Sequence, residues 1–393
     1  MFRWCLAPRP SWNKRRWWSG DVVLPLVPKV GDRKCLPGPA RASARHSHPA
    51  RDAVTSLLKL GIAGTGFIAG VVARSLAETR RVSLTAVASR RPERARSFAD
   101  AHGARAFDTW QELVGWEGLD AVYVATPTAA REEICLAAAH HHKHLLAEKP
   151  FTNLASLQRI TGACRGAGVA FLDATHFTHH PRTAQLKREL PSRIGTIRAI
   201  RGSFFFPSMD QSNIRFDPAQ EPTGAIGDMA WYNMRAVAEF TPPDASLVSA
   251  SGYAERDDVT GAMVRGAGVL LLSNGCTSVW DAGYNTGASV MDLDLIGERG
   301  MISLDDFVLD WAGGFPVPAP DYPVGFTQRS GVVNPSGFNR VDTPSATRQV
   351  VRMIEAFASL AGEPRGPQVR ESMLLSERTQ GLLDAVWNQL TFV

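Results

Sequence analysis

The chain has 393 residues, enough for two domains, because a single hydrophobic core stops growing at about 250–300 residues. Hydrophobic residues make up 44% and charged residues 21%, and no apolar run reaches the roughly 18 residues of a membrane-spanning helix, so we expect no membrane partner. The net charge of +5 comes from the first 56 residues alone, because residues 57–393 hold 32 basic and 35 acidic side chains, and we therefore expect no nucleic-acid partner.

Residues 1–56, here called the leader, hold 11 basic and three acidic residues and show no apolar periodicity. We interpret the leader as disordered or as a start site assigned too far upstream; an organelle transit peptide is the alternative. The five cysteines have neither paired nor metal-type spacing, which fits a reducing compartment. We expect a cytoplasmic protein.

From Leu57 on, short apolar runs alternate with amphipathic stretches, the pattern of a parallel, doubly wound sheet. The predicted strands are residues 57–64, 82–89, 104–107, 119–126, 144–148 and 169–175. Helical patterns lie between them, for example at 93–103 and 131–142. We expect an α/β dinucleotide-binding Rossmann domain over residues 57–178.

Beyond about residue 180 the apolar runs become longer and alternate with polar residues, which is typical of an antiparallel sheet. These strands are predicted within residues 194–206, 245–256, 260–283 and 291–306. Helices are predicted at 228–240, at about 347–361 and at about 371–388. Residues 179–393 should therefore form an α+β domain with a largely antiparallel sheet, which we expect to serve substrate binding and oligomerisation.

The first predicted strand runs directly into the sequence GTGFIA, which has the G-x-G-x-x-A form of a dinucleotide-binding turn. The first glycine permits a tight turn, the second lets the backbone approach a pyrophosphate, and the following helix N-terminus favours the anion. We assign Gly64, Thr65, Gly66, Phe67 and Ile68 to the cofactor site.

The second strand ends in Ser89 and Arg90, where an NAD-specific site would place an acidic residue for the ribose hydroxyl. A hydroxyl followed by a guanidinium suits a 2′-phosphate, because arginine pairs with phosphate oxygens in a bidentate way. We therefore favour NADP, with NAD as the alternative.

Two further strands end in residues that we place at the ligand-binding edge of the sheet, and we assign both groups to the cofactor site. The fourth strand ends at Thr126 and Pro127, and the fifth ends at Glu148 and Lys149.

The sequences GTGFIA, SRRPERA, DAVYVATPT and KHLLAEKP, in this order and at these spacings, resemble the glucose-fructose oxidoreductase, inositol dehydrogenase and MocA family, especially its branch of dimeric dihydrodiol dehydrogenases. The likeness extends over about residues 58–390. It implies an NAD(P)-dependent oxidoreductase acting on a sugar, polyol or related hydroxy or carbonyl compound. It also implies that Lys149 lies beside the nicotinamide and the substrate.

The family's second motif is a glycine-rich turn, an aspartate, and a histidine or tyrosine four residues later; here Asp228 and Tyr232 match it. Spacing of four residues places two side chains on one helix face. We expect Tyr232 to be the acid/base, because a phenol can transfer the proton of an alcohol if a cation such as Lys149 stabilises its anion. Asp228 would anchor a substrate hydroxyl or orient the lysine.

Two positions depart from the family pattern: Arg131 stands where a histidine is frequent, and Pro222–Ala225 interrupts the glycine triplet. The first puts the nicotinamide-side contacts in doubt, and the second the shape of the substrate pocket. We expect no metal site, because His140, His141 and His142 are consecutive and cannot face one ion together.

Three more histidines, His176, His179 and His180, lie near the expected domain junction, where one of them would line the cleft or all would be structural. Two other functions compete with a dehydrogenase or reductase: an NAD-dependent glycoside hydrolase and a non-catalytic NADP-binding regulator. We expect a homodimer or higher homo-oligomer formed through the C-terminal sheet.

Overall fold

The computed structural model describes residues 57–208, 210–312 and 318–393. The predictions for the leader therefore lie outside the described residues. Within the described part of the chain, no helix is both long enough and apolar enough to cross a membrane.

The N-terminal part contains a six-stranded parallel sheet in the order β3-β2-β1-β4-β5-β6. Its strands are β1 Leu58–Ala63, β2 Val82–Ala88, β3 Arg105–Phe107, β4 Ala121–Val124, β5 His144–Ala147 and β6 Phe171–Asp173. This is the Rossmann order, in which the chain leaves β1 in one direction for β2 and β3 and returns to its other side for β4. The crevice between the carboxyl ends of β1 and β4 is where such sheets bind ligands.

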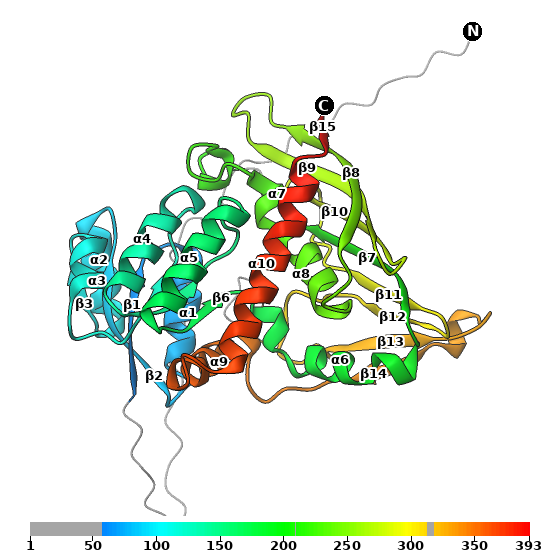
Figure 1. Ribbon diagram of the computed structural model, residues 1–393, viewed down its shortest axis with the longest axis horizontal. Helices are drawn as coiled ribbons and strands as arrows, with labels where there is room; N and C mark the ends of the chain where they lie inside the picture. The colour runs from blue at the N-terminus through cyan, green and yellow to red at the C-terminus, as the bar shows by residue number, and fades with distance from the viewer. Residues whose placement is uncertain (1–56, 209, 313–317) are drawn as a thin grey trace, which may run out of the picture. The chain divides into compact units, whose positions relative to one another are not determined.

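Helices cover both faces of this sheet (Figure 1). Leu60, Ile62 and Leu172 face the apolar sides of α1 and α9, whereas Val122 and Leu145 face those of α3, α4 and α5. The bounds are α1 Phe67–Leu76, α2 Pro92–His102, α3 Trp110–Gly115, α4 Thr128–His140, α5 Leu154–Ala167 and α9 Gln349–Gly362. The helix predicted near 347–361 thus returns from the far end of the chain to complete the Rossmann layer.

The second sheet is mixed and mostly antiparallel, in the order β14-β13-β12-β11-β7-β10-β9-β8-β15. Only the pairs β7–β10 and β8–β15 are parallel among its described strands. The bounds are β7 Ile197–Phe205, β8 Leu247–Arg256, β9 Met263–Leu272, β10 Thr277–Gly283, β11 Leu293–Gly297, β12 Met301–Leu304, β13 Gly325–Arg329, β14 Asn339–Asp342 and β15 Leu390–Phe392. The predicted fold class is confirmed.

Two short helices and one long helix pack on the second sheet, and the long helix also contacts the first sheet. α7 Gly224–Asp228 packs on β9 and β10, and α8 Ala230–Phe240 packs on β7 and β10. α10 Pro367–Trp387 contacts α5 and β6 on one side and α8 and β8 on the other (Figure 1). The 3₁₀ turn η1 His176–His179 and helix α6 Pro181–Arg193 lead from β6 into the second sheet. This arrangement brings α7, α8 and η1 to the carboxyl edge of the parallel sheet.

Candidate active site

The glycine turn after β1 has the backbone that the sequence predicts. Gly64 has φ +116°, and a Cβ there would lie 2.6 Å from the carbonyl oxygen of Ala125, so the position requires glycine. A Cβ at Gly66 would meet nothing within 4 Å, and Gly66 precedes α1 without any side-chain cap. Gly66 has no side chain, so the turn leaves space beside the start of this ten-residue helix, as a pyrophosphate site requires.

The end of β2 lies against this turn. The hydroxyl of Thr65 donates a 3.2 Å hydrogen bond to Ser89 Oγ, which joins the two strand ends. Arg90 is exposed, and its guanidinium donates to Gln220 Oε1 at 2.9 Å. The predicted 2′-phosphate residues therefore adjoin the predicted pyrophosphate turn.

A segment of the second domain that the sequence reasoning missed spans the ends of β2 and β4. Besides the bond from Arg90, the Gln220 carbonyl accepts from Ala129 N at 3.1 Å. The carboxylate of Glu221 accepts from Thr128 N at 3.1 Å and from Thr128 Oγ1 at 2.6 Å, which caps α4 from a distant part of the chain. No local sequence motif predicts these contacts.

The departure at Arg131 has a structural reason. Its guanidinium is buried and donates to the carbonyl oxygens of Thr126, at 2.7 Å, and Pro150. Arg131 thus ties the end of β4 to the turn after β5. Beside it, Thr126 Oγ1 is buried without a hydrogen-bond partner, which leaves an unsatisfied polar atom next to the predicted cofactor residue Pro127.

Lys149 and Asp228 form an ion pair beside this turn. Lys149 Nζ lies 2.5 Å from Asp228 Oδ1 and 2.8 Å from the Asp228 carbonyl oxygen, and the lysine side chain is 7% exposed. The other oxygen of Asp228 accepts from Arg215 Nε at 2.7 Å and from the Tyr284 hydroxyl at 3.1 Å. Burial raises the pKa of Asp228, but Lys149 and Arg215 outweigh it and hold that pKa well below its ordinary value.

These contacts bear on the two roles expected of Asp228. Both carboxylate oxygens are engaged by cations or by a hydroxyl, so the geometry favours orientation of Lys149 over anchoring of a substrate. Arg215 and Tyr284 were missed from the sequence, because they lie 13 residues before and 56 residues after Asp228 and belong to no motif.

Glu148 is buried next to Lys149, and the Tyr123 hydroxyl donates to its Oε1 at 2.5 Å. Burial raises the pKa of Glu148, and Lys149 opposes this shift. The Glu148 side chain thus bonds to the core of the parallel sheet, through a tyrosine of β4.

Tyr232 lies on the other side of Lys149. Lys149 Nζ is 4.9 Å from the centre of the Tyr232 ring, so the cation faces the ring. The Tyr232 hydroxyl lies 3.2 Å from His176 Nε2. Asp228 ends α7 and Tyr232 belongs to α8, so the two do not share one continuous helix as expected, although both meet at Lys149.

The electrostatic surroundings keep the phenol protonated. Burial raises the pKa of Tyr232 well above its ordinary value, and the nearby carboxylates of Glu148 and Asp228 raise it further. At neutral pH Tyr232 therefore carries its proton.

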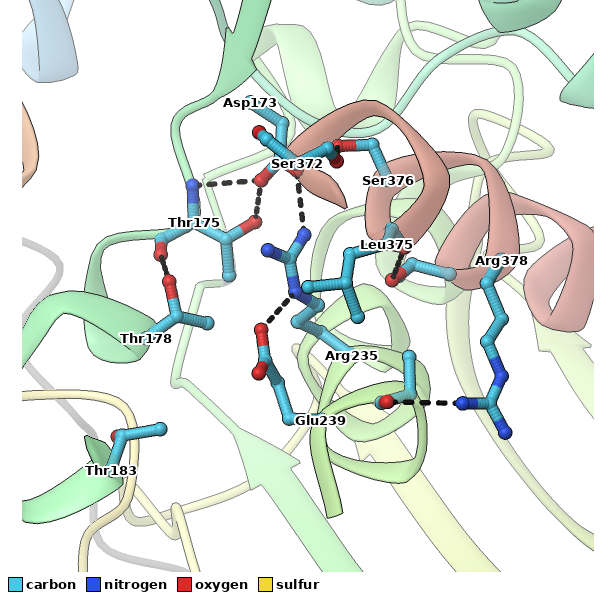
Figure 2. Close-up of polar contacts among 12 residues, drawn as sticks. Asp173, Thr175, Thr178, Thr183, Arg235, Glu239, Ser372, Leu375, Ser376 and Arg378 are labelled. Atoms are coloured by element: carbon cyan, nitrogen blue, oxygen red, sulfur yellow. Dashed lines mark hydrogen bonds and ion pairs between the residues drawn. The ribbon is translucent and has the colours of Figure 1, made fainter. Parts of the chain in front are cut away.

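A buried polar network fixes α8 relative to β6. The carboxylate of Asp173 accepts from Arg235 Nη1 at 2.6 Å and from the hydroxyl of Ser376 in α10 (Figure 2). Arg235 also donates to Glu239 at 2.9 Å. Because Arg235 lies one helical turn after Tyr232, this network holds the helix that carries the phenol.

The interrupted glycine triplet keeps the glycine that the turn needs. Gly224 has φ +46°, and a Cβ there would lie 2.4 Å from the carbonyl oxygen of Met263. Among the described residues, no group of three His, Cys, Asp or Glu side chains is arranged to hold a metal ion. His140, His141 and His142 are exposed.

Comparisons with known proteins match two stretches of the chain to models of one protein family. Residues 58–174 match the oxidoreductase family with an NAD-binding Rossmann fold, and residues 190–303 match the GFO/IDH/MocA C-terminal domain. An NADP-dependent scyllo-inositol 2-dehydrogenase of Bacillus subtilis is 31% identical over 263 residues, which are 63% of this chain and 76% of that protein. An NADP-dependent D-xylose 1-dehydrogenase of Haloferax volcanii is 30% identical over 58% of this chain and 70% of that protein.

Among solved structures, a 3-ketoreductase from Actinomadura kijaniata in complex with NADP and TDP-benzene is similar along almost its whole length. The TM-score is 0.77 at 26% identity, and the match covers 86% of this chain and 99% of that chain.

Proposed function

This chain belongs to the GFO/IDH/MocA oxidoreductase family, and from that premise we propose that it transfers a hydride between NADP and a carbon of a sugar, polyol or related hydroxy or carbonyl compound. The observation that carries the proposal is the contact of Lys149 with Asp228 and with the ring of Tyr232, at the carboxyl edge of a parallel sheet whose first strand ends in the glycine turn.

The residues of the Rossmann part fit the cofactor. The turn Gly64–Ile68 would receive the pyrophosphate, Ser89 and Arg90 the 2′-phosphate, and Thr126, Pro127, Glu148 and Lys149 would adjoin the nicotinamide end. When bound, the nicotinamide supplies or accepts the hydride. We accordingly assign cofactor binding to residues 57–178 and substrate binding to residues 179–393.

Three side chains would carry the proton chemistry. Tyr232 donates its proton to the substrate oxygen as the carbonyl carbon is reduced, and takes the proton back when an alcohol is oxidised. The ammonium of Lys149 polarises the substrate oxygen and favours the phenolate form of Tyr232. Asp228 orients Lys149 through the 2.5 Å ion pair.

We further propose a homo-oligomer built through the open face of the second sheet. Val269, Leu271 and Val279 lie on the face opposite α7 and α8 and are 43%, 36% and 47% exposed. Val279 is paired with Val269 across neighbouring strands, so these side chains form one apolar patch. Light scattering should show a dimer or larger species that dissociates in Val269→Glu; a monomeric parent would contradict this proposal.

We place the protein in the cytoplasm. The cysteines in the described part of the chain, Cys135, Cys164 and Cys276, are free and buried, which suits a reducing compartment.

The experiment that tests the function follows reduced-cofactor absorbance while purified protein is incubated with sugars, inositols and dihydrodiols. NADP-dependent turnover that is lost in Tyr232→Phe and Lys149→Met supports an oxidoreductase. Release of an aglycone from a glycoside without net cofactor change would instead identify a glycoside hydrolase. Binding of NADP without turnover of any compound would fit a regulatory protein.

A further inference from the structure

His176 is the immediate neighbour of the Tyr232 hydroxyl, and both of its ring nitrogens are engaged. Nε2 lies 3.2 Å from Tyr232 Oη, and Nδ1 lies 2.8 Å from Nε2 of Gln349. His176 is 5% exposed and Gln349 is fully buried. The contact between His176 and Gln349 joins η1 to the first residue of α9, 173 positions away in the chain.

The orientation of the Gln349 amide decides which ring nitrogen carries the proton. Gln349 Nε2 also donates to the carbonyl oxygen of Val308 at 2.7 Å. The reversed amide would place two acceptor oxygens in contact there, so the nitrogen must face Val308. The same nitrogen then donates its second hydrogen to His176 Nδ1, which must be an acceptor.

Neighbouring bonds hold both residues in place. Gln349 N donates to Asp310 Oδ2 at 2.7 Å, which fixes the start of α9. On the other side, Trp231 Nε1 donates to Thr175 Oγ1 at 2.8 Å. These two residues directly precede Tyr232 and His176 in the chain, so this bond lies next to the contact between His176 and Tyr232. Thr175 is itself bound to Asp173, as Figure 2 shows.

We propose that Gln349 fixes His176 as the neutral tautomer with hydrogen on Nε2, and that this N–H donates to Tyr232 Oη and makes His176 a positioning residue for proton transfer. The inference rests on the proposed function of Tyr232. A neutral imidazole whose Nδ1 accepts a hydrogen bond carries its own hydrogen on Nε2. When Tyr232 passes its proton to the substrate oxygen, the N–H of His176 stabilises the phenolate oxygen that remains.

The surroundings keep His176 neutral. Burial, together with the positive charge of Lys149 and with His179, lowers the pKa of His176 to about 3. His176 thus stays a donor with no charge of its own throughout the physiological range. The charged groups whose fields reach the Tyr232 hydroxyl are Lys149, Glu148, Asp173, Asp228 and Arg215.

The tautomer is tested without any activity measurement, by NMR of the ring nitrogens in full-length protein labelled in histidine. The histidine whose signals are assigned to His176 should remain neutral with hydrogen on Nε2 from pH 7 down to about pH 5, well below the ordinary histidine pKa. Its signals should disappear in His176→Gln and change in Gln349→Glu, because the new carboxylate would accept hydrogen from Nδ1. A His176 signal with hydrogen on Nδ1 would overturn the proposal.

The functional effect is tested by the pH profile of alcohol oxidation at pH values below the pKa of Tyr232. In that range turnover should rise with pH, because the small fraction of phenolate rises. His176→Leu should move this rise upward by about one to two pH units, since it removes a hydrogen bond to a charged oxygen. His176→Gln should have a profile close to that of the parent, because the glutamine amide keeps a hydrogen-bond donor near the position of Nε2. His179→Leu, on the same turn, is the matched control and should leave the profile in place.

The outcomes separate the two proposals. If the parent protein has no turnover but His176 shows the expected tautomer, only the proposed function is refuted. An active parent in which His176→Leu, shown by circular dichroism to be folded, keeps the parent profile would refute the role of His176. Equal damage by leucine and glutamine would identify a packing role and also overturn the inference.

Discussion

Lys149 and Asp228 are joined by a 2.5 Å ion pair between Nζ and Oδ1, although 79 residues separate them in the chain. The pair connects the end of β5 in the parallel sheet to the end of α7 in the second domain. It holds the ammonium over the ring of Tyr232, and so links the predicted cofactor side of the cleft to its predicted substrate side.

Replacement of Asp228 by asparagine tests this relationship. The amide keeps the shape but leaves Lys149 and Arg215 without their shared anion, so we expect turnover to fall by about ten- to a hundredfold. The KM for substrate should change by less than about threefold, because the carboxylate oxygens are already engaged. Steady-state kinetics measure both quantities.

Tyr284→Phe is the matched control for Asp228→Asn. It removes one hydrogen bond, at 3.1 Å, from an uncharged hydroxyl to the same carboxylate and leaves the ion pair intact, so it should lower turnover much less. A large rise in KM at unchanged turnover in Asp228→Asn would show that Asp228 binds the substrate directly.

Arg90 should set the preference for NADP over NAD. Arg90→Ala removes a charge-assisted phosphate contact, and we expect NADP affinity to fall by about ten- to a hundredfold while NAD affinity stays constant. Titration followed by cofactor fluorescence measures both dissociation constants. Arg91→Ala, also exposed at the same strand end, should have a smaller effect. Equal affinity of the parent for both cofactors would contradict the assignment.

The buried histidines should make the fold sensitive to acid. Burial lowers the pKa values of His176 and His180 to about 3 and that of His179 to about 4. The unfolded chain takes up protons below about pH 6.5, whereas the folded chain does not, so the free energy of unfolding falls as the pH falls. Each histidine contributes about 1.4 kcal/mol per pH unit once the pH is well below 6.5.

His180→Asn isolates one of these contributions. His180 accepts a 3.0 Å hydrogen bond from Arg182 N at the start of α6, and asparagine is also a good helix cap. Between about pH 6 and 5, the free energy of unfolding should change less steeply with pH in His180→Asn than in the parent. The difference in slope should be roughly the contribution of one histidine. Chemical denaturation at several pH values measures the slope. An unchanged slope would mean that His180 is protonated in the folded protein.

Local patterns were sufficient to predict most of the Rossmann sheet and the cofactor turn. Each of the six parallel strands, and the turn with Gly64 and Gly66, depends on a short stretch of sequence: an apolar run for the strands, and a backbone conformation that requires glycine for the turn. The helix at α9 was also predicted, but its packing on the parallel sheet was not, because sequence periodicity gives the apolar face of a helix and not its partner.

The parts of the site that could not be predicted depend on long-range contacts. Gln349 and Tyr284 reach the site from positions with no motif around them, and α3, α5 and α6 were not predicted as separate elements. The roles assigned to Lys149, Asp228 and Tyr232 came from the family resemblance, and they remain predictions until the substitutions are measured.

The most direct test of the account is the turnover of Tyr232→Phe. Phenylalanine keeps the packing against Phe204 and Phe177 and removes only the hydroxyl that carries the exchangeable proton. We expect turnover to fall by about 10² to 10⁴ while the dissociation constant for NADP stays within about twofold of the parent. Turnover close to that of the parent across the pH range would contradict the assignment of Tyr232 as the acid/base.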